Sequence, residues 1–307
     1  MESLTITRSK FTWNYTVIGI VILIITGGFF FLTVGKGIGK GDFFKNRFRP
    51  NNNSNITTLN KLNEEWELPD GYTMETVQIN SMDANWIYSD HGSQEKVILQ
   101  LHGGAYIHSL EDNGIQYQRS AVKYAEISDA RVLTIDYRVA PEDPFPAALE
   151  DAVMAYKWLL SNDYKAENII IAGDSAGGGL TLATTMYLRD NKIELPAALI
   201  TMSAWTDLSY TKLKVPYVGE SSAKDPYISP LYGNYEKFPP MLMQVGGAEE
   251  LLKDTTKVAK KAKAADVKVT QTTYDDMFHV FQLLYPVLPE ASVAWDEVER
   301  FIQTIPW

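Results

Sequence analysis

Short apolar runs rich in β-branched residues recur along the chain after residue 70. They lie at 97–99, 132–135, 169–171, 199–201, 241–243 and 267–270. Longer stretches in which apolar residues have helical spacing separate most of these runs, as at 147–160, 180–189 and 250–264. The short runs predict strands and the longer stretches predict helices. Because strands that alternate with helices need crossover connections, the pattern predicts an α/β fold with a mainly parallel sheet flanked by helices.

Two further strand-like segments, at 73–79 and 86–89, have no helical stretch between them. They therefore predict an antiparallel hairpin at the edge of the sheet. In open α/β sheets, ligand and catalytic groups gather beyond the carboxyl ends of the parallel strands. Each motif considered below follows a predicted strand of this kind.

The composition is that of a globular protein without disulfides. Hydrophobic residues make up 45% of the 307 residues, and there is no cysteine, so the chain has neither a thiol nucleophile nor a cysteine ligand for a metal. The net charge is −10; residues 1–50 hold seven Lys and Arg against two acidic residues, a net of +5, which leaves −15 on the remainder. Nucleic acid is an unfavourable partner for so acidic a body, because phosphates need Lys and Arg to neutralise them.

The uncharged stretch at 11–35 predicts a membrane anchor. As a helix, its 25 residues would rise roughly 37 Å, which is enough to cross a hydrocarbon core of about 30 Å. We place the anchor at residues 1–35, with the span at about 12–34. A cleaved signal peptide is the alternative, but the apolar run exceeds the usual length and no clear Ala-x-Ala site follows it.

A basic and asparagine-rich segment at 36–56 is interpreted as a linker. Five basic residues follow the predicted span: Lys36, Lys40, Lys45, Arg47 and Arg49. Only two precede it, so the positive-inside rule favours a body on the cytoplasmic side of the cell membrane.

A Gly-x-Ser-x-Gly motif at 173–177 follows one predicted strand and precedes a helical stretch. Glycines on both sides of the serine permit a sharp strand-to-helix turn that presents the hydroxyl. The pattern alone occurs by chance in a chain of this length, and an ordinary glycine-rich turn is the alternative. Its position between a strand and a helix makes Ser175 the candidate nucleophile.

A serine nucleophile needs an adjacent base, usually a histidine. The chain has four histidines: His91, His102, His108 and His279. Only His279 lies beyond Ser175, where the chain order nucleophile, acid, base of this fold requires it. His279 also comes just after the strand predicted at 267–274, so it is the candidate base.

The acid that orients the histidine is expected after the strand that precedes the histidine's own strand. There, a Gly-Gly pair at 246–247 is followed by Glu249, which we take as the acid. A carboxylate at this place fixes the imidazole tautomer and stabilises the imidazolium. Glu250 and Asp254 are the alternatives, and either could instead favour the N-terminus of the following helix.

Backbone N–H groups are expected to bind the oxyanion that develops on the substrate. The segment at 102–106 carries a Gly-Gly pair after the strand at 97–101, and the residue after the nucleophile opens a helix. We therefore predict Gly103, Gly104 and Ala176 as the donors. A plain Gly-Gly turn is the alternative, and His102 is expected to brace the loop.

Together these residues resemble the hormone-sensitive-lipase-like family of α/β-hydrolases, in its bacterial esterase branch. The match runs from about residue 80 to the C-terminus through five motifs: HGGAY at 102–106, DYRVAPE at 136–142 with PFPA at 144–147, GDSAGG at 173–178, SPLY at 229–232 and MFHVF at 277–281. The resemblance implies an α/β-hydrolase domain over 57–307 and a serine carboxylesterase that acts on short- to medium-chain acyl esters without cofactor or metal. It also implies a small helical cap, here at about 57–68 and 207–235.

The chain departs from the family pattern at two places. The family's oxyanion loop usually has a third glycine, where this chain has Ala105, and its acid is typically Asp, where this chain has Glu249. An amidase or peptidase with the same residues is the alternative function, since it differs only in the leaving group. A non-catalytic binding protein on the same fold is a further alternative, although such proteins commonly lose one of the three catalytic residues.

Overall fold

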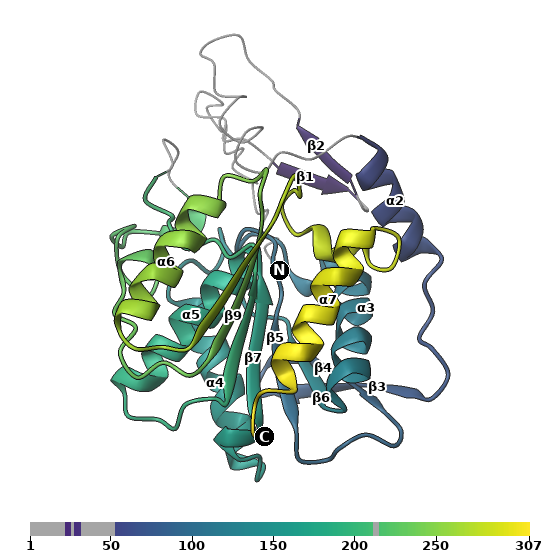
Figure 1. Cartoon of the computed structure of the whole chain (residues 1–307), viewed down its shortest axis with the longest axis horizontal. Coiled ribbons are helices and arrows are strands. Elements are labelled where there is room, and N and C mark those ends of the chain that lie inside the picture. The colour runs from purple at the N-terminus through teal and green to yellow at the C-terminus, as the bar shows by residue number, and fades with distance from the viewer. Residues whose placement is uncertain (1–21, 26–27, 32–52, 211–214) are drawn as a thin grey trace, which may run out of the picture.

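The computed structural model describes residues 22–25, 28–31, 53–210 and 215–307. An eight-stranded sheet lies at its centre, with helices on both faces (Figure 1). The strands are β3 (Tyr72–Ile79), β4 (Met82–Ser89), β5 (Val97–Leu101), β6 (Arg131–Ile135), β7 (Ile169–Asp174), β8 (Ala198–Met202), β9 (Met241–Gly246) and β10 (Val269–Tyr274).

The strand order is β10-β9-β8-β7-β5-β6-β4-β3. All neighbours from β10 to β6 pair in parallel, whereas β4 pairs antiparallel with both β6 and β3. The mainly parallel sheet predicted from the strand and helix pattern is thus confirmed, and so is the antiparallel hairpin at its edge. The carboxyl ends of β7, β9 and β10 lie at one edge of the sheet, because these strands run in the same direction.

Five helices cover the two faces of the sheet (Figure 1). On one face lie α3 (Leu110–Ser128) and α7 (Pro289–Ile302); on the other lie α4 (Ala147–Ser161), α5 (Ser175–Asp190) and α6 (Leu252–Ala264). The helices predicted at 147–160, 180–189 and 250–264 correspond to α4, α5 and α6. Helix α5 begins at Ser175, one residue before the helix opening expected at Ala176 and five before the apolar stretch at 180–189.

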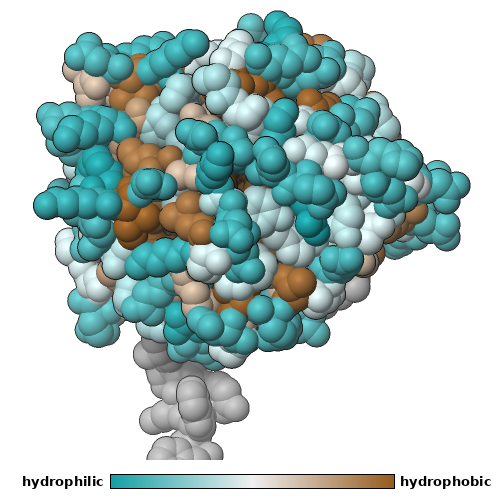
Figure 2. All heavy atoms as spheres, turned by 90° about the horizontal axis from the view of Figure 1, so that it is seen from below, coloured by the Kyte–Doolittle hydropathy of each residue, from teal (hydrophilic) through white to brown (hydrophobic). Residues whose placement is uncertain are grey.

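The strand residues divide between two cores. In β5, Val97, Leu99 and Leu101 pack on the side of α4, α5 and α6, whereas Ile98 packs on the side of α3 and α7. Both faces of a parallel sheet are buried in this way, which explains why its strands appear in the sequence as continuous apolar runs. In the view of Figure 2, hydrophilic side chains cover most of the surface and hydrophobic atoms form small groups between them.

The anchor helix predicted at about 12–34 lies mostly outside the described residues. Two short pieces of it are described, β1 (Ile22–Ile25) and β2 (Gly28–Phe31), and they pair as antiparallel strands rather than as helical turns. Isoleucine and phenylalanine favour strands, which accounts for this difference from the predicted helix. In the parts of the chain that the structure covers, no helix has the length and apolar character needed to cross a membrane.

The segments predicted as linker and cap also differ in detail from the prediction. Helix α2 (Asn53–Glu64) begins inside the asparagine-rich linker and lies beside the short helix η4 (Phe281–Leu284). In the described part of 207–235, the only helical elements are two short 3-10 turns, η2 (Pro216–Val218) and η3 (Pro230–Tyr232). Prolines begin both turns, and side chains such as Tyr217 and Tyr235 pack into the main core.

Candidate active site

Ser175 lies at the turn between β7 and α5. Its φ of +50° is in the left-handed region, which a non-glycine residue rarely adopts. Glycine is required on both sides of this turn: a Cβ at Gly177 would overlap the Leu101 carbonyl oxygen, and one at Gly173 would overlap the Gly177 carbonyl. The Gly-x-Ser-x-Gly motif therefore forms the sharp strand-to-helix turn that the sequence predicts.

The structure brings Ser175, His279 and Glu249 into one hydrogen-bonded chain. His279 Nε2 lies 2.9 Å from Ser175 Oγ, and His279 Nδ1 lies 2.6 Å from Glu249 Oε2. An ionised carboxylate can only accept, so Nδ1 donates to Glu249 and Nε2 is left to accept the Ser175 hydroxyl. The Glu249 side chain is 1% exposed and that of His279 10%, so water competes little for this contact.

The other oxygen of Glu249 is also held. Glu249 Oε1 accepts a hydrogen bond of 2.7 Å from the Gly246 N–H and another of 2.7 Å from Ser203 Oγ. Both carboxylate oxygens are thus fixed by the end of β9, the loop after β8 and the histidine. Of the candidate acids, the structure brings Glu249 to His279, while the Asp254 carboxylate lies 3.5 Å from Lys257 Nζ.

The predicted oxyanion donors differ in the hydrogen bonds that their N–H groups make. The Gly103 N–H donates a 2.6 Å hydrogen bond to Tyr117 Oη, so it is already engaged. Within the ranges that the structure describes, no hydrogen bond from the Gly104 or the Ala105 N–H is found. Among the described contacts, the N–H groups of Gly104 and of Ala105, the latter at φ +57°, are therefore available to a substrate oxygen, and Ala105 is a candidate donor that the sequence prediction did not include.

A buried hydrogen-bond network holds this loop against the nucleophile turn. Tyr117 Oη accepts from Gly103 and donates to Asp174 Oδ2 at 3.1 Å. A Cβ on Gly103 would lie 2.5 Å from that same carboxylate oxygen, so the loop and the turn are in direct contact. Burial raises the pKa of Asp174 to about 6, and the hydrogen bond from Tyr117 opposes that rise.

His102 braces the loop, as expected, and is not placed to be a second base. Its ring stacks on Tyr137 with 4.0 Å between centroids, and its Nδ1 donates to the Gly103 carbonyl at 2.7 Å. Tyr137 Oη in turn donates to the His102 carbonyl at 2.5 Å. Complete burial lowers the pKa of His102 to about 4, so the ring stays neutral at neutral pH.

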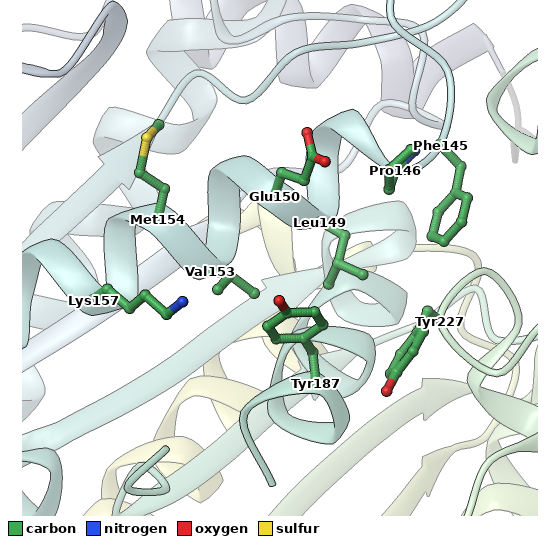
Figure 3. Close-up of a pocket in the computed structure, with 9 residues that line it drawn as sticks. All are labelled: Phe145, Pro146, Leu149, Glu150, Val153, Met154, Lys157, Tyr187 and Tyr227. Carbon is green, nitrogen blue, oxygen red and sulfur yellow. The ribbon is translucent and has the colours of Figure 1, made fainter. Parts of the chain in front are cut away.

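A hollow lies elsewhere, beside α4 and the end of α5 (Figure 3). It has a volume of about 600 Å³ and is lined mostly by apolar side chains, with the rings of Tyr187 and Tyr227 facing Leu149 and Val153 of α4. It includes none of the candidate catalytic residues. Across the described part of the chain, no group of three or more His, Asp or Glu side chains is placed to hold a metal ion.

Comparisons with known proteins agree on one family. A family model described as alpha/beta hydrolase fold matches residues 98–283, which include all the candidate site residues. An acetyl-hydrolase of Streptomyces hygroscopicus is 33% identical over 250 residues, covering 75% of this chain and 82% of that protein. The crystal structure of an esterase from the bacterial hormone-sensitive lipase family is 34% identical, with a TM-score of 0.73 over 83% of this chain and 93% of that one. The crystal structure of EstE5, soaked with p-nitrophenyl butyrate, is 34% identical, with a TM-score of 0.72 over 87% of this chain and 93% of that one.

Proposed function

The chain belongs to the α/β-hydrolase fold family, among the hormone-sensitive-lipase-like ester hydrolases, and we propose that Ser175, His279 and Glu249 carry its reaction on short- to medium-chain acyl esters. The observation that supports these roles best is the unbroken chain of hydrogen bonds, 2.9 Å from serine to histidine and 2.6 Å from histidine to glutamate. The first distance allows a proton to pass from the hydroxyl to the imidazole, and the second allows Glu249 to orient the imidazole.

In the first half of the reaction, the Ser175 hydroxyl attacks the ester carbonyl carbon. His279 Nε2 takes the hydroxyl proton as the new C–O bond forms, and Glu249 stabilises the imidazolium through Nδ1. The carbonyl oxygen becomes an oxyanion held by the N–H groups of Gly104, Ala105 and Ala176. The C–O bond to the alcohol then breaks, and the alcohol leaves with the proton from His279.

The second half repeats these steps with water as the nucleophile. His279 takes a proton from the water as it attacks the acyl-serine, and the oxyanion forms again at the same amides. The bond to Ser175 Oγ then breaks, the proton returns to the serine, and the carboxylic acid is released. No cofactor or metal takes part in these steps.

The preference for short- to medium-chain esters is supported by the relatives. One is named an acetyl-hydrolase, and another was soaked with a butyrate ester. We propose that α2 and the segment 207–235 form the cap at the mouth of the site within the hydrolase domain 57–307. Helix α2 lies beside η4, and η4 begins two residues beyond His279, which supports a position of α2 near the site.

A chain-length series tests this proposal. The purified protein is expected to hydrolyse p-nitrophenyl acetate and butyrate with a higher kcat/KM than the dodecanoate, and to hydrolyse the matched p-nitroanilides more slowly. The reason is that the same machinery must expel an amine rather than a phenolate. Anilide turnover equal to or above ester turnover would favour an amidase or peptidase, and no turnover of either would favour a non-catalytic binding protein.

We also propose that in the bilayer residues 12–34 form a spanning helix in place of the short strands β1 and β2, and that this helix anchors the protein in the cell membrane with its body on the cytoplasmic side. The 25 uncharged residues at 11–35 and the excess of Lys and Arg after them support this. The full-length protein is expected to stay in the membrane pellet after carbonate extraction, and its body is expected to resist protease added to intact cells. Release by carbonate would contradict the anchor, and digestion in intact cells would contradict the orientation.

A further inference from the structure

Ser203 lies in the loop after β8, in a position that the sequence did not single out. It is fully buried, and its φ of +51° is in the left-handed region. Backbone strain of this kind persists only where the surrounding structure enforces it, and it concentrates at functional sites. The surroundings of Ser203 are the acid and the base of the candidate active site.

The Ser203 hydroxyl connects these two groups. Ser203 Oγ donates a hydrogen bond of 2.7 Å to Glu249 Oε1 and accepts one of 3.1 Å from the Val280 N–H. Val280 directly follows His279 and has a φ of +50°, which is unusual for a β-branched residue. One hydroxyl therefore holds both the carboxylate of the acid and the strained backbone next to the base.

The same loop also contacts the nucleophile. The Trp205 N–H donates a 2.8 Å hydrogen bond to the Ser175 carbonyl, and the Ser203 N–H donates one of 2.8 Å to the Gln244 carbonyl of β9. The loop after β8 thus forms hydrogen bonds with Ser175 itself, with Glu249 and its strand β9, and with the residue that follows His279. A small shift of Ser203 would therefore change the positions of both Glu249 and the backbone beside His279.

A glutamate needs such support more than an aspartate would. Its side chain has one more methylene and one more rotatable bond, so more conformations are lost when the carboxylate is fixed. Glu249 Oε1 has two donors, the Gly246 N–H and the Ser203 hydroxyl. Without the hydroxyl, one backbone donor alone would fix this oxygen, and Glu249 could rotate away from His279.

We propose that Ser203 is a positioning residue, which ties the Glu249 carboxylate to the backbone that carries His279 and so keeps acid and base in register for ester hydrolysis. This inference rests on the proposed function of the three residues. Ser203 itself does not touch the reacting atoms, so its effect is expected on kcat rather than on KM.

The test compares Ser203→Ala and Ser203→Gly with the wild type in the full-length protein. Both substitutions remove the hydroxyl, and glycine also suits the left-handed backbone. Active sites are titrated with a fluorophosphonate so that kcat refers to competent protein only. Misplaced catalytic groups commonly cost about 10- to 100-fold, and we expect both variants to lose kcat on this scale with KM nearly unchanged.

Ser128→Ala is the matched control. Ser128 is also buried, donates to a carbonyl (Tyr124) and accepts from an N–H (Ala130), but it lies at the end of α3. The Ser128→Ala variant is expected to lose about as much stability as Ser203→Ala and to keep the kcat of the wild type. A loss of kcat in Ser128→Ala equal to that in Ser203→Ala would overturn the inference, because a general loss of packing would then explain both.

A double-mutant cycle with Glu249→Ala separates positioning from general structural support. When the carboxylate is absent, the hydroxyl has no acid to hold, so Ser203→Ala is expected to change kcat by less than about threefold in that background. The same fold-loss in both backgrounds would overturn the inference. An inactive wild type would instead refute the proposed function, and an active wild type matched by both Ser203 variants would refute only the role of Ser203.

Discussion

Replacing Ser175 with alanine is expected to lower kcat for p-nitrophenyl butyrate by about 10⁴- to 10⁶-fold, as removal of a serine nucleophile does in other hydrolases. Alanine lacks the atom that forms the acyl-enzyme, and the amides of Gly104, Ala105 and Ala176 can supply only the residual rate. Steady-state kinetics over a range of ester concentrations measures this loss.

The fold should survive this substitution, because the serine hydroxyl is small. Among the described residues, its hydrogen-bond partner is His279. A melting temperature and circular dichroism spectrum close to those of the wild type would show that the loss is chemical. If the alanine variant keeps substantial turnover, with contaminating esterases excluded by a mock purification, Ser175 is not the nucleophile.

Replacing Glu249 with glutamine should have the second largest effect, a fall in kcat of about 10³- to 10⁴-fold. Glutamine keeps the shape of the side chain but not its charge, so it can neither fix the Nδ1–H tautomer of His279 with equal strength nor stabilise the imidazolium. The measurement is kcat for the same ester, with the protein shown to be folded.

Glu250→Gln is the matched control, because it makes the same chemical change one residue further along. Glu250 is half-buried, whereas Glu249 is buried against His279, so the control is expected to keep kcat within about twofold of the wild type. A large loss in Glu250→Gln together with near-normal activity in Glu249→Gln would move the acid to Glu250 and contradict the assignment made here.

Much of the sheet and of the site could be predicted because both depend on local patterns. Strands buried on both faces, such as β5 and β7, are continuous apolar runs, and the candidate residues follow the ends of such strands. Chain order was enough to choose His279, since it alone among the histidines follows Ser175. Glu249 was chosen because it is the first acidic residue after the glycines at the end of β9.

Other features depend on contacts between distant segments and could not be predicted. Gly103 was chosen as an amide donor because a glycine lets its N–H approach a substrate oxygen, but this N–H is taken by Tyr117, fourteen residues later, whose hydroxyl position follows only from the packing of α3. Ala105 was noted only as a departure from the family's third glycine and was not among the predicted donors. Ser203 gave no signal at all, since its role depends on its contacts with residues 249 and 280.

The start of α5 shows how packing overrides local preference. Three glycines follow Ser175 and Ala176, and glycine is a poor helix former, so the stretch with helical apolar spacing begins only at 180, although the helix was expected to open at Ala176. In the structure these glycines are helical. The packing of this helix start against the Leu101 and Ala204 backbone requires residues without a Cβ, which explains why glycines stand there. In the described part of the segment predicted as cap, 207–235, aromatic side chains such as Tyr217 and Tyr235 pack into the core around 3-10 turns.

Labelling with a fluorophosphonate tests the central claim most directly, because such a reagent reacts only with a serine made nucleophilic by its surroundings. The native protein is expected to gain one phosphonyl group, mapped by peptide mass spectrometry to Ser175, and to lose esterase activity in proportion. The heat-unfolded protein and the His279→Ala variant are expected to remain unlabelled. No adduct on the active native protein, or an adduct on a different serine, would contradict the account.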